Sequence, residues 1–338
     1  MKGLLPATLL LTSTALSAVV NTAIAADAAV QTAPANRYAN RPFPGAEATV
    51  TALLSKDLSD REAQTLFGHL FARHDDFETV VELLEERADE QPEAALVQLR
   101  FGQAACQLAG HPDTGMLGKA GLAGDCRDAL EKASELDPKL LNAWRGLFDF
   151  YRQAPGVVGG GIDKAEAVVA KIALIDPAEA EQARATLAGQ QEQYDKMRGH
   201  FAKAAELNPA KAEEFRFRES MALVRAKQYE AAYEVLGSLL KTTDTELAAQ
   251  VQYQLGRTAV IAANPAWCAA AEGHLQAYLA RTDLTTDMPA KSWAAFRLGQ
   301  VYELMGKAEL SRQQYLWAAG QQPDEPLKAE LKKKGIKA

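Results

Sequence analysis

The sequence predicts an all-helical protein that is built from stacked pairs of antiparallel helices. Apolar residues recur at spacings of three and four along most of the chain, which is typical of amphipathic helices, and no alternating strand pattern interrupts them. Small residues, aromatic residues and prolines return together at similar intervals. This period indicates that short helices bury their faces against neighbouring copies of one unit, and strand-based folds are excluded.

Composition and charge fit a water-soluble protein. The chain has 338 residues, of which 48% are hydrophobic and 24% are charged. Its formal net charge of −7 would on average repel polyanions and anionic lipid surfaces. We therefore expect no nucleic-acid partner.

The first element is a predicted cleavable signal peptide over residues 1–25. Lys2 gives a positive start, residues 4–20 are mostly apolar, and Ala23-Ile24-Ala25 is a small-x-small cleavage site. Cleavage after Ala25 would place the mature chain in a periplasm, with a Gram-negative bacterium as the expected source. A retained membrane anchor is the alternative, and no second apolar run of spanning length follows.

The folded part is expected to start after a flexible segment over residues 26–46, which is rich in Ala, Pro and Asn. Residues 47–338 are the predicted solenoid domain. Its last pair, residues 292–323, combines Leu298-Gly299, Tyr302, Tyr315 and Ala318. The prolines that we expect to end the second helices are Pro92, Pro138, Pro177, Pro209 and Pro323. A helix from Glu325 to Lys334 is expected to cap the stack.

These anchors resemble the tetratricopeptide repeat (TPR) family. Residues 154–161, APGVVGGG, are also similar to a loop of exported bacterial TPR proteins. The resemblance covers residues 47–325. It implies a right-handed superhelix of roughly seven helix pairs plus a capping helix, with an inner wall that binds a protein or peptide.

Candidate binding residues follow from the same resemblance. In TPR proteins the first helix of each pair lines the groove at places two, five, nine and twelve of the repeat. Carried over by register, these residues are Asn142, Arg145, Asp149, Arg152, Arg216, Tyr253, Arg257, Trp293 and Phe296. Arginine beside aromatic side chains suits an extended peptide with a carboxylate. A solvated face with aromatic residues in the core is the alternative interpretation.

Two insertions, near residues 110–125 and 154–161, fall at the turns between paired helices. We expect them to form one glycine-rich rim that could hold a carboxylate or phosphate. The rim residues are Lys119, Gly156, Gly159, Gly160, Gly161 and Lys164. Alternatively, the glycines only let a long turn fold back on the solenoid. A P-loop is excluded, because Ile162 and Asp163 stand where it needs Lys and Ser or Thr.

The three cysteines allow one disulfide. Cys106 and Cys126 bracket the first insertion and could form a bond in an oxidising compartment, while two buried free thiols are the alternative. This would leave Cys268 without a partner in the chain. No cysteine or histidine spacing indicates a metal site, and we expect no metal and no cofactor.

The function that the sequence favours is a non-catalytic periplasmic scaffold or adaptor for a protein or peptide. The alternative is a small-molecule or anion-binding accessory protein of uptake or envelope assembly that uses the glycine-rich rim. The third hypothesis is an enzyme. Its candidate catalytic residues would be His111 and Asp113 in the first insertion.

Overall fold

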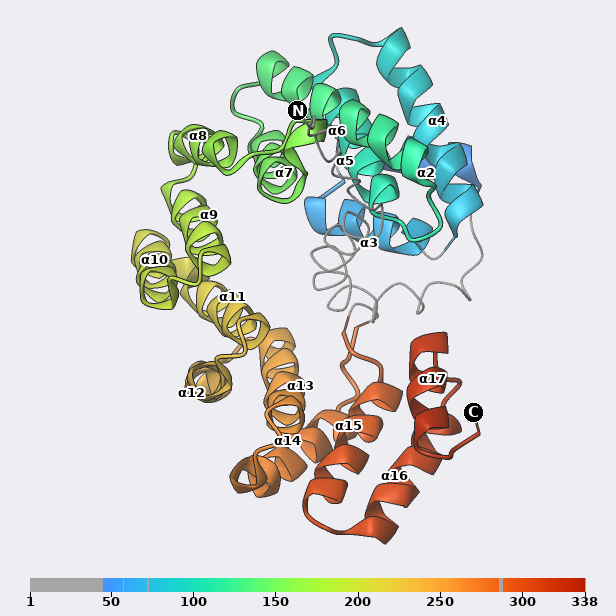
Figure 1. Ribbon diagram of the computed structural model, residues 1–338, viewed down its shortest axis with the longest axis vertical. Coiled ribbons are helices and arrows are strands. Elements are labelled where there is room, and N and C mark those ends of the chain that lie inside the picture. The colour runs from blue at the N-terminus through green and yellow to red at the C-terminus, as the bar shows by residue number, and fades with distance from the viewer. Residues whose placement is uncertain (1–44, 57, 72, 286–287, 338) are drawn as a thin grey trace, which may run out of the picture.

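The computed structural model describes residues 45–56, 58–71, 73–285 and 288–337, which form seven antiparallel helix pairs between one leading and one final helix (Figure 1). The predicted signal peptide and almost all of the segment over 26–46 lie outside the described residues. The leading helix is α2 (Ala46–Leu53), and the pairs are α3 (Asp60–Phe71) with α4 (His74–Glu90), α5 (Ala95–Ala109) with α6 (Met116–Leu136), α7 (Leu141–Gln153) with α8 (Ile162–Ala173), α9 (Pro177–Gln190) with α10 (Tyr194–Leu207), α11 (Ala212–Arg225) with α12 (Tyr229–Ser238), α13 (Thr245–Ile261) with α14 (Cys268–Ala280), and α15 (Lys291–Leu304) with α16 (Ala308–Ala319). The final helix is α17 (Glu325–Lys333), and the described residues contain no strand.

The prolines mark the pair boundaries as predicted. Pro92, Pro138 and Pro209 each follow shortly after the end of a second helix, because proline cannot continue the helical hydrogen bonding. Pro177 also follows such a helix and is itself the first residue of α9. Asp176 caps α9 by accepting hydrogen bonds from the backbone N–H groups of residues 178 and 179 at 3.0 and 3.1 Å.

Small residues let the two helices of a pair approach closely. A Cβ on Gly256 of α13 would lie 2.3 Å from Cγ of Leu275 on α14, and one on Gly299 of α15 would lie 2.5 Å from Cε1 of Tyr315 on α16. Neither position can carry a larger residue without repacking, since protein interiors are close-packed. The glycine of the Leu298-Gly299 pair thus has the packing role that the repeat predicts.

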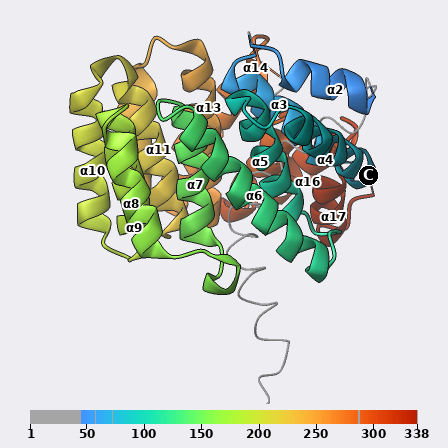
Figure 2. The ribbon, with the colours of Figure 1, turned by 90° about the horizontal axis from the view of Figure 1, so that it is seen from above.

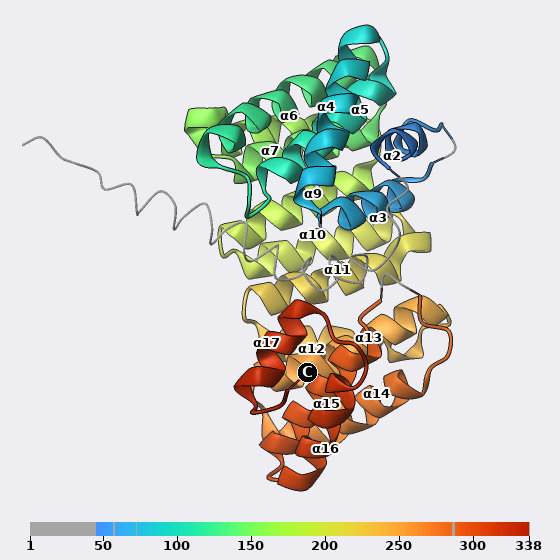
Figure 3. The same cartoon turned by 90° about the vertical axis from the view of Figure 1, so that its right-hand side faces the viewer.

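The pairs stack into a right-handed superhelix (Figure 1). The first helices α7, α9, α11, α13 and α15 lie on the inner side of the curve, and α8, α10, α12 and α14 lie on the outer side. Seen from above, the axes of helices α7, α8, α10 and α11 are nearly aligned (Figure 2). Along the long axis, α2 and α4 to α7 lie at one end, α3 lies level with α9 and α10 in the middle, and α12 to α17 lie at the other end (Figure 3).

The curve brings the first pair into contact with the sixth. Arg61 on α3 donates from Nη1 and Nη2 to both carboxylate oxygens of Glu246 on α13, at 3.0 and 2.7 Å. Glu246 also lies in the first turn of its helix, where a negative charge is favourable. Because both side chains are accessible to water, this pair contributes about 0–1 kcal/mol and links the two pairs only weakly.

The core is divided along the stack. One apolar cluster extends from α2 to α9 and includes the fully buried Phe67, Phe77 and Leu130. Another extends over α13 to α17 and includes Leu275 and Phe296. Stability is therefore distributed among neighbouring pairs, as in other solenoids. Among the described helices, none has both the length and the apolarity needed to cross a bilayer.

Candidate functional site

A chain of polar side chains joins three consecutive first helices on the inner side of the curve. We call it the inner ladder: Arg145 on α7, Glu179 and Gln182 on α9, and Glu214 and Arg218 on α11. Arg145 Nη2 lies 2.7 Å from Glu179 Oε1, and Arg218 Nη1 lies 4.0 Å from the same oxygen. Arg218 also donates hydrogen bonds to Gln182 and Glu214. The ladder thus connects α7, α9 and α11 through one carboxylate.

Burial differs sharply between the members of the inner ladder. The side chain of Glu179 is 4% exposed, whereas that of Arg145 is 35% exposed. A buried carboxylate needs a hydrogen-bonded cation, so Arg145 is tied to Glu179 and cannot move freely. The two arginines and two glutamates balance in charge. The ladder therefore presents fixed donors and acceptors of both signs along the inner surface.

The four candidates on α7 form two hydrogen-bonded pairs within that helix. Arg145 Nη1 donates to Asn142 Oδ1 at 3.0 Å, and Arg152 Nε donates to Asp149 Oδ1 at 2.8 Å. The other residues of the inner ladder were not among the predicted contacts. Glu179 and Gln182 occupy places two and five of the fourth repeat, the same places as Asn142 and Arg145 in the third, so the repeat register could have identified them.

Two predicted arginines lie elsewhere. Arg216 turns toward the end of α12, where its Nη2 donates to Ser238 Oγ at 3.1 Å, and Arg218 takes the inner position instead. Arg257 on α13 donates to Gln254 Oε1 at 3.5 Å. Burial lowers the pKa of the Arg257 guanidinium, and the nearby Arg297 lowers it further. Neither arginine joins the inner ladder.

The prediction of three aromatic groove contacts is wrong. Tyr253, Trp293 and Phe296 are all buried. Tyr253 packs on Tyr278 with ring centroids 5.5 Å apart, and the Nε1–H of Trp293 donates to Asp324 Oδ2 at 3.0 Å. In these C-terminal pairs all three side chains belong to one apolar cluster, so the core reaches the places that the register assigns to the groove. The structure supports the alternative interpretation of core aromatics.

The glycine loop over residues 154–161 uses its own polar groups. The N–H groups of Gly159, Gly160 and Gly161 donate to the carbonyls of Gly156, Pro155 and Tyr151 at 3.0, 3.2 and 2.8 Å. The ammonium of Lys164 donates to the Gly159 carbonyl at 2.8 Å. The predicted anion site needs these same donors, and all of them already have partners within the turn. The structure therefore supports the alternative, in which the glycines let the turn fold back on the solenoid.

The predicted single rim is also wrong in its geometry. Only residues 110–115 of the first insertion form a connection, because α6 begins at Met116 and the rest, including Lys119, extends that helix. The second loop contacts α6 at Arg127 instead, whose Nη1 donates to the Val158 carbonyl at 3.3 Å. The first connection packs on the α3–α4 turn, where Thr114 Oγ1 lies 3.1 Å from His74 Nε2.

We expect Gly160→Ala to destabilise the loop measurably. A Cβ at residue 160 would lie 1.8 Å from the carbonyl oxygen of Ala154, which is backbone and cannot swing away. Overpacking of this kind costs about 1–3 kcal/mol in the free energy of unfolding, which chemical denaturation would measure. Gly156→Ala is the matched control, since a Cβ there meets nothing within 4 Å. Equal losses in the two variants would contradict the close-approach explanation.

His111 and Asp113 do not form an open catalytic cluster. His111 is buried, its Nε2 lies 2.9 Å from the Phe71 carbonyl, and its Nδ1 accepts a hydrogen bond from the N–H of Asp113. Burial lowers the pKa of His111. Nearby His74 lies 3.6 Å from Asp75 through Nδ1 and 3.6 Å from Glu78 through Nε2, and both carboxylates are on the exposed side of the turn. These histidines serve as packing residues at the α3–α4 turn.

Cys106 on α5 and Cys126 on α6 are joined as a disulfide, with Cα atoms 5.0 Å apart. This separation is within the range of ordinary disulfides. The bond ties α5 to α6 where the N-terminal extension of α6 joins the rest of that helix. Cys268 is free and buried, and burial raises the pKa of its thiol.

Comparisons with known proteins add similarity in structure alone. No family model and no curated protein matches the chain. Similar solved structures include PilW, a type IV pilus biogenesis factor, with 18% identity, 68% of this chain and 98% of that chain covered, and a TM-score of 0.44. A TPR protein from Parabacteroides merdae has 14% identity, coverage of 85% and 98%, and a TM-score of 0.46. YrrB, described as a TPR protein with an unusual peptide-binding site, has 17% identity, coverage of 75% and 99%, and a TM-score of 0.34. At these scores, the assignment of a TPR-type solenoid rests on the chain's own helix pairs.

Proposed function

We propose that the protein is a non-catalytic scaffold that binds an extended segment of another protein along the inner ladder. The ladder is the observation that supports this most directly. Its side chains are already held by Glu179 and Gln182, so binding would not require them to be ordered first. Fixed guanidinium, amide and carboxylate groups along three helices match the alternating donors and acceptors of an extended backbone.

The charge of the ladder narrows the class of partner. The negative charges of Glu179 and Glu214 would largely cancel the attraction of the two arginines for a purely acidic peptide. A polar segment with charges of both signs fits better. This modifies the expectation from the sequence, in which arginine beside aromatic side chains favoured a peptide with a carboxylate or acidic side chain.

Site-specific photocrosslinking tests the scaffold proposal. A photoreactive phenylalanine analogue at residue 182 would sit on the inner ladder, and one at Lys171 would sit on the exposed outer face of α8. We expect ultraviolet light to attach a protein to the chain at residue 182 and not at residue 171. Attachment at residue 171 alone, or equally at both positions, would argue against inner-surface binding.

We also propose that the protein works in the periplasm. The support is the signal-peptide pattern of residues 1–25. Intact-mass measurement of the chain exported by a Gram-negative host is expected to give a protein that begins at Ala26. A mass that still includes the leader would contradict cleavage.

Arg145→Met should destabilise the fold as well as weaken binding. The change leaves Glu179 buried with Arg218 as its remaining cation at 4.0 Å. An unsatisfied buried group costs about 1–3 kcal/mol, so chemical denaturation should show a loss in that range. Adding Glu179→Gln should restore part of the loss, because the uncompensated charge is then removed.

Lys132→Met is the control for that experiment. Lys132 pairs with Glu93 at 3.2 Å, and both side chains are exposed. Loss of an exposed pair should cost at most about 1 kcal/mol. If Arg145→Met were as mild as Lys132→Met, the buried pair would not hold the ladder in place. A binding test of the ladder therefore needs the double variant Arg145→Met with Glu179→Gln.

A further inference from the structure

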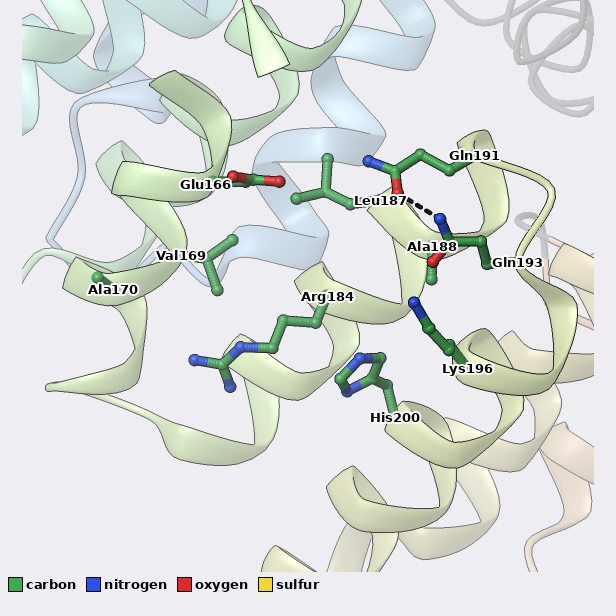
Figure 4. Close-up of a pocket in the computed structure, with 10 residues that line it drawn as sticks. All are labelled: Glu166, Val169, Ala170, Arg184, Leu187, Ala188, Gln191, Gln193, Lys196 and His200. Atoms are coloured by element: carbon green, nitrogen blue, oxygen red, sulfur yellow. Dashed lines mark hydrogen bonds between the residues drawn. The ribbon is translucent and has the colours of Figure 1, made fainter. Parts of the chain in front are cut away.

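A separate pocket lies between the outer helices α8 and α10, with α9 as its floor (Figure 4). Its volume is about 370 Å³, which is enough for a small organic ligand. Val169 and Leu187 form an apolar wall. Figure 4 shows Arg184, Lys196 and His200 along one side of the pocket and Glu166 across from them. The pocket therefore combines an apolar surface with a cationic side.

A buried carboxylate fixes the cationic side. Glu181 Oε1 accepts a hydrogen bond from Arg184 Nη1 at 2.8 Å and lies 3.1 Å from Lys203 Nζ. Its other oxygen lies 2.7 Å from His200 Nδ1. Burial alone would raise the pKa of Glu181, but hydrogen bonds from His200 and Lys203 outweigh burial and lower it. Glu181 therefore stays ionised and holds Arg184 and His200 in place.

Positive charge is in excess around the pocket. Arg184 and Lys203 are both charged and share the single carboxylate of Glu181. Lys196 at the pocket edge adds a third charge, and it has no ion pair within the part of the chain that the structure describes. The guanidinium of Arg184 has N–H groups beyond the one that bonds Glu181. Among the residues that line the pocket, Glu166 carries the one carboxylate that opposes these groups.

We propose that this pocket binds the carboxylate of an organic acid with a small apolar body. The carboxylate would lie beside the ammonium of Lys196, and the apolar body would lie over the parts of Val169 and Leu187 that line the pocket. Charge-assisted hydrogen bonds to a carboxylate are about twice as strong as neutral ones. The same group could belong to a free acid or to the C-terminus of a peptide.

This site is independent of the inner ladder. Glu179 faces α7 and α11, whereas Glu181, two residues along α9, faces α10. Failure of the pocket would leave the scaffold proposal unaffected, and failure of inner-surface binding would leave the pocket intact.

Calorimetric titration of the full mature chain tests the pocket with paired probes. One pair is 4-methylpentanoate and its neutral amide, and the other is an N-acetylated dipeptide that ends in leucine, with a free or an amidated C-terminus. We expect at least one acid to bind, and its amide to bind about tenfold or more weakly. Tighter binding of the short acid would identify a free small molecule as the source of the carboxylate, and tighter binding of the peptide acid would identify a C-terminus.

Two lysine variants locate the binding. Lys196→Gln should weaken binding of the acid about tenfold. It should not affect folding, because Lys196 is exposed. Lys171→Gln, an exposed lysine on α8 outside the pocket, should leave the affinity unchanged. The proposal is overturned if neither acid binds at concentrations up to about 10 mM, if acid and amide bind equally, or if Lys196→Gln has no effect.

Discussion

Phe296→Ala is expected to lower the free energy of unfolding of the C-terminal pairs by about 3–5 kcal/mol. Phe296 is 0% exposed and packs on Trp293 and Tyr315, with ring centroids 5.9 and 5.2 Å away. Its removal leaves a cavity between α15 and α16, because close-packed neighbours relax only partly. Chemical denaturation measures the loss. Hydrogen exchange should show it first in α15 to α17, since each pair of a solenoid contacts mainly its neighbours.

Trp317→Ala is the matched control for this prediction. Trp317 lies on α16 and is 42% exposed, so truncation of this still larger side chain should cost much less. The opposite pattern would be informative. If Phe296→Ala left stability unchanged and weakened partner binding, the groove register would be right for this residue and the packing described here would be wrong.

The fold could be predicted because its signals are steric and local. Gly299 opposite Tyr315, the small residue Ala318 and the prolines after second helices each act within one pair or at one boundary. Such signals repeat with the period of the helix pairs, so the register of the pairs can be predicted without knowledge of the complete structure. The helical extension of α6 escaped this reading, because its three glycines favour a loop when they are considered one by one.

The binding surface was predicted less well. The exposure of a side chain depends on which other helices pack against it, and the repeat register does not give this information. Trp293 and Phe296 occupy groove places, but both are buried in the apolar cluster of the C-terminal pairs. Arg216 and Arg218 differ by two positions on one helix, and only contact with Gln182 on α9 shows which of them faces inward. Similarly, the glycine loop has the composition of an anion site, while its amides are already bonded within the turn.

Reduction of the disulfide is expected to lower the free energy of unfolding by about 3 kcal/mol in the chain-entropy account. Cys106 and Cys126 are 20 residues apart, so the bond closes a loop in the unfolded chain and removes much of its freedom. Denaturation with and without a reductant measures the difference in one protein without any substitution. Cys268 remains a thiol in both states and does not contribute.

The double variant Cys106→Ser with Cys126→Ser separates the bond from other effects of the reductant. It should have the stability of the reduced protein, and added reductant should not change it further. Unreduced native protein should have a mass two hydrogens below the all-thiol value, as one disulfide requires. Three titratable thiols after unfolding without reductant would show that the bond does not form. In that case the contact between α5 and α6 would depend on packing alone, with Gly102 facing Leu130 across the same pair.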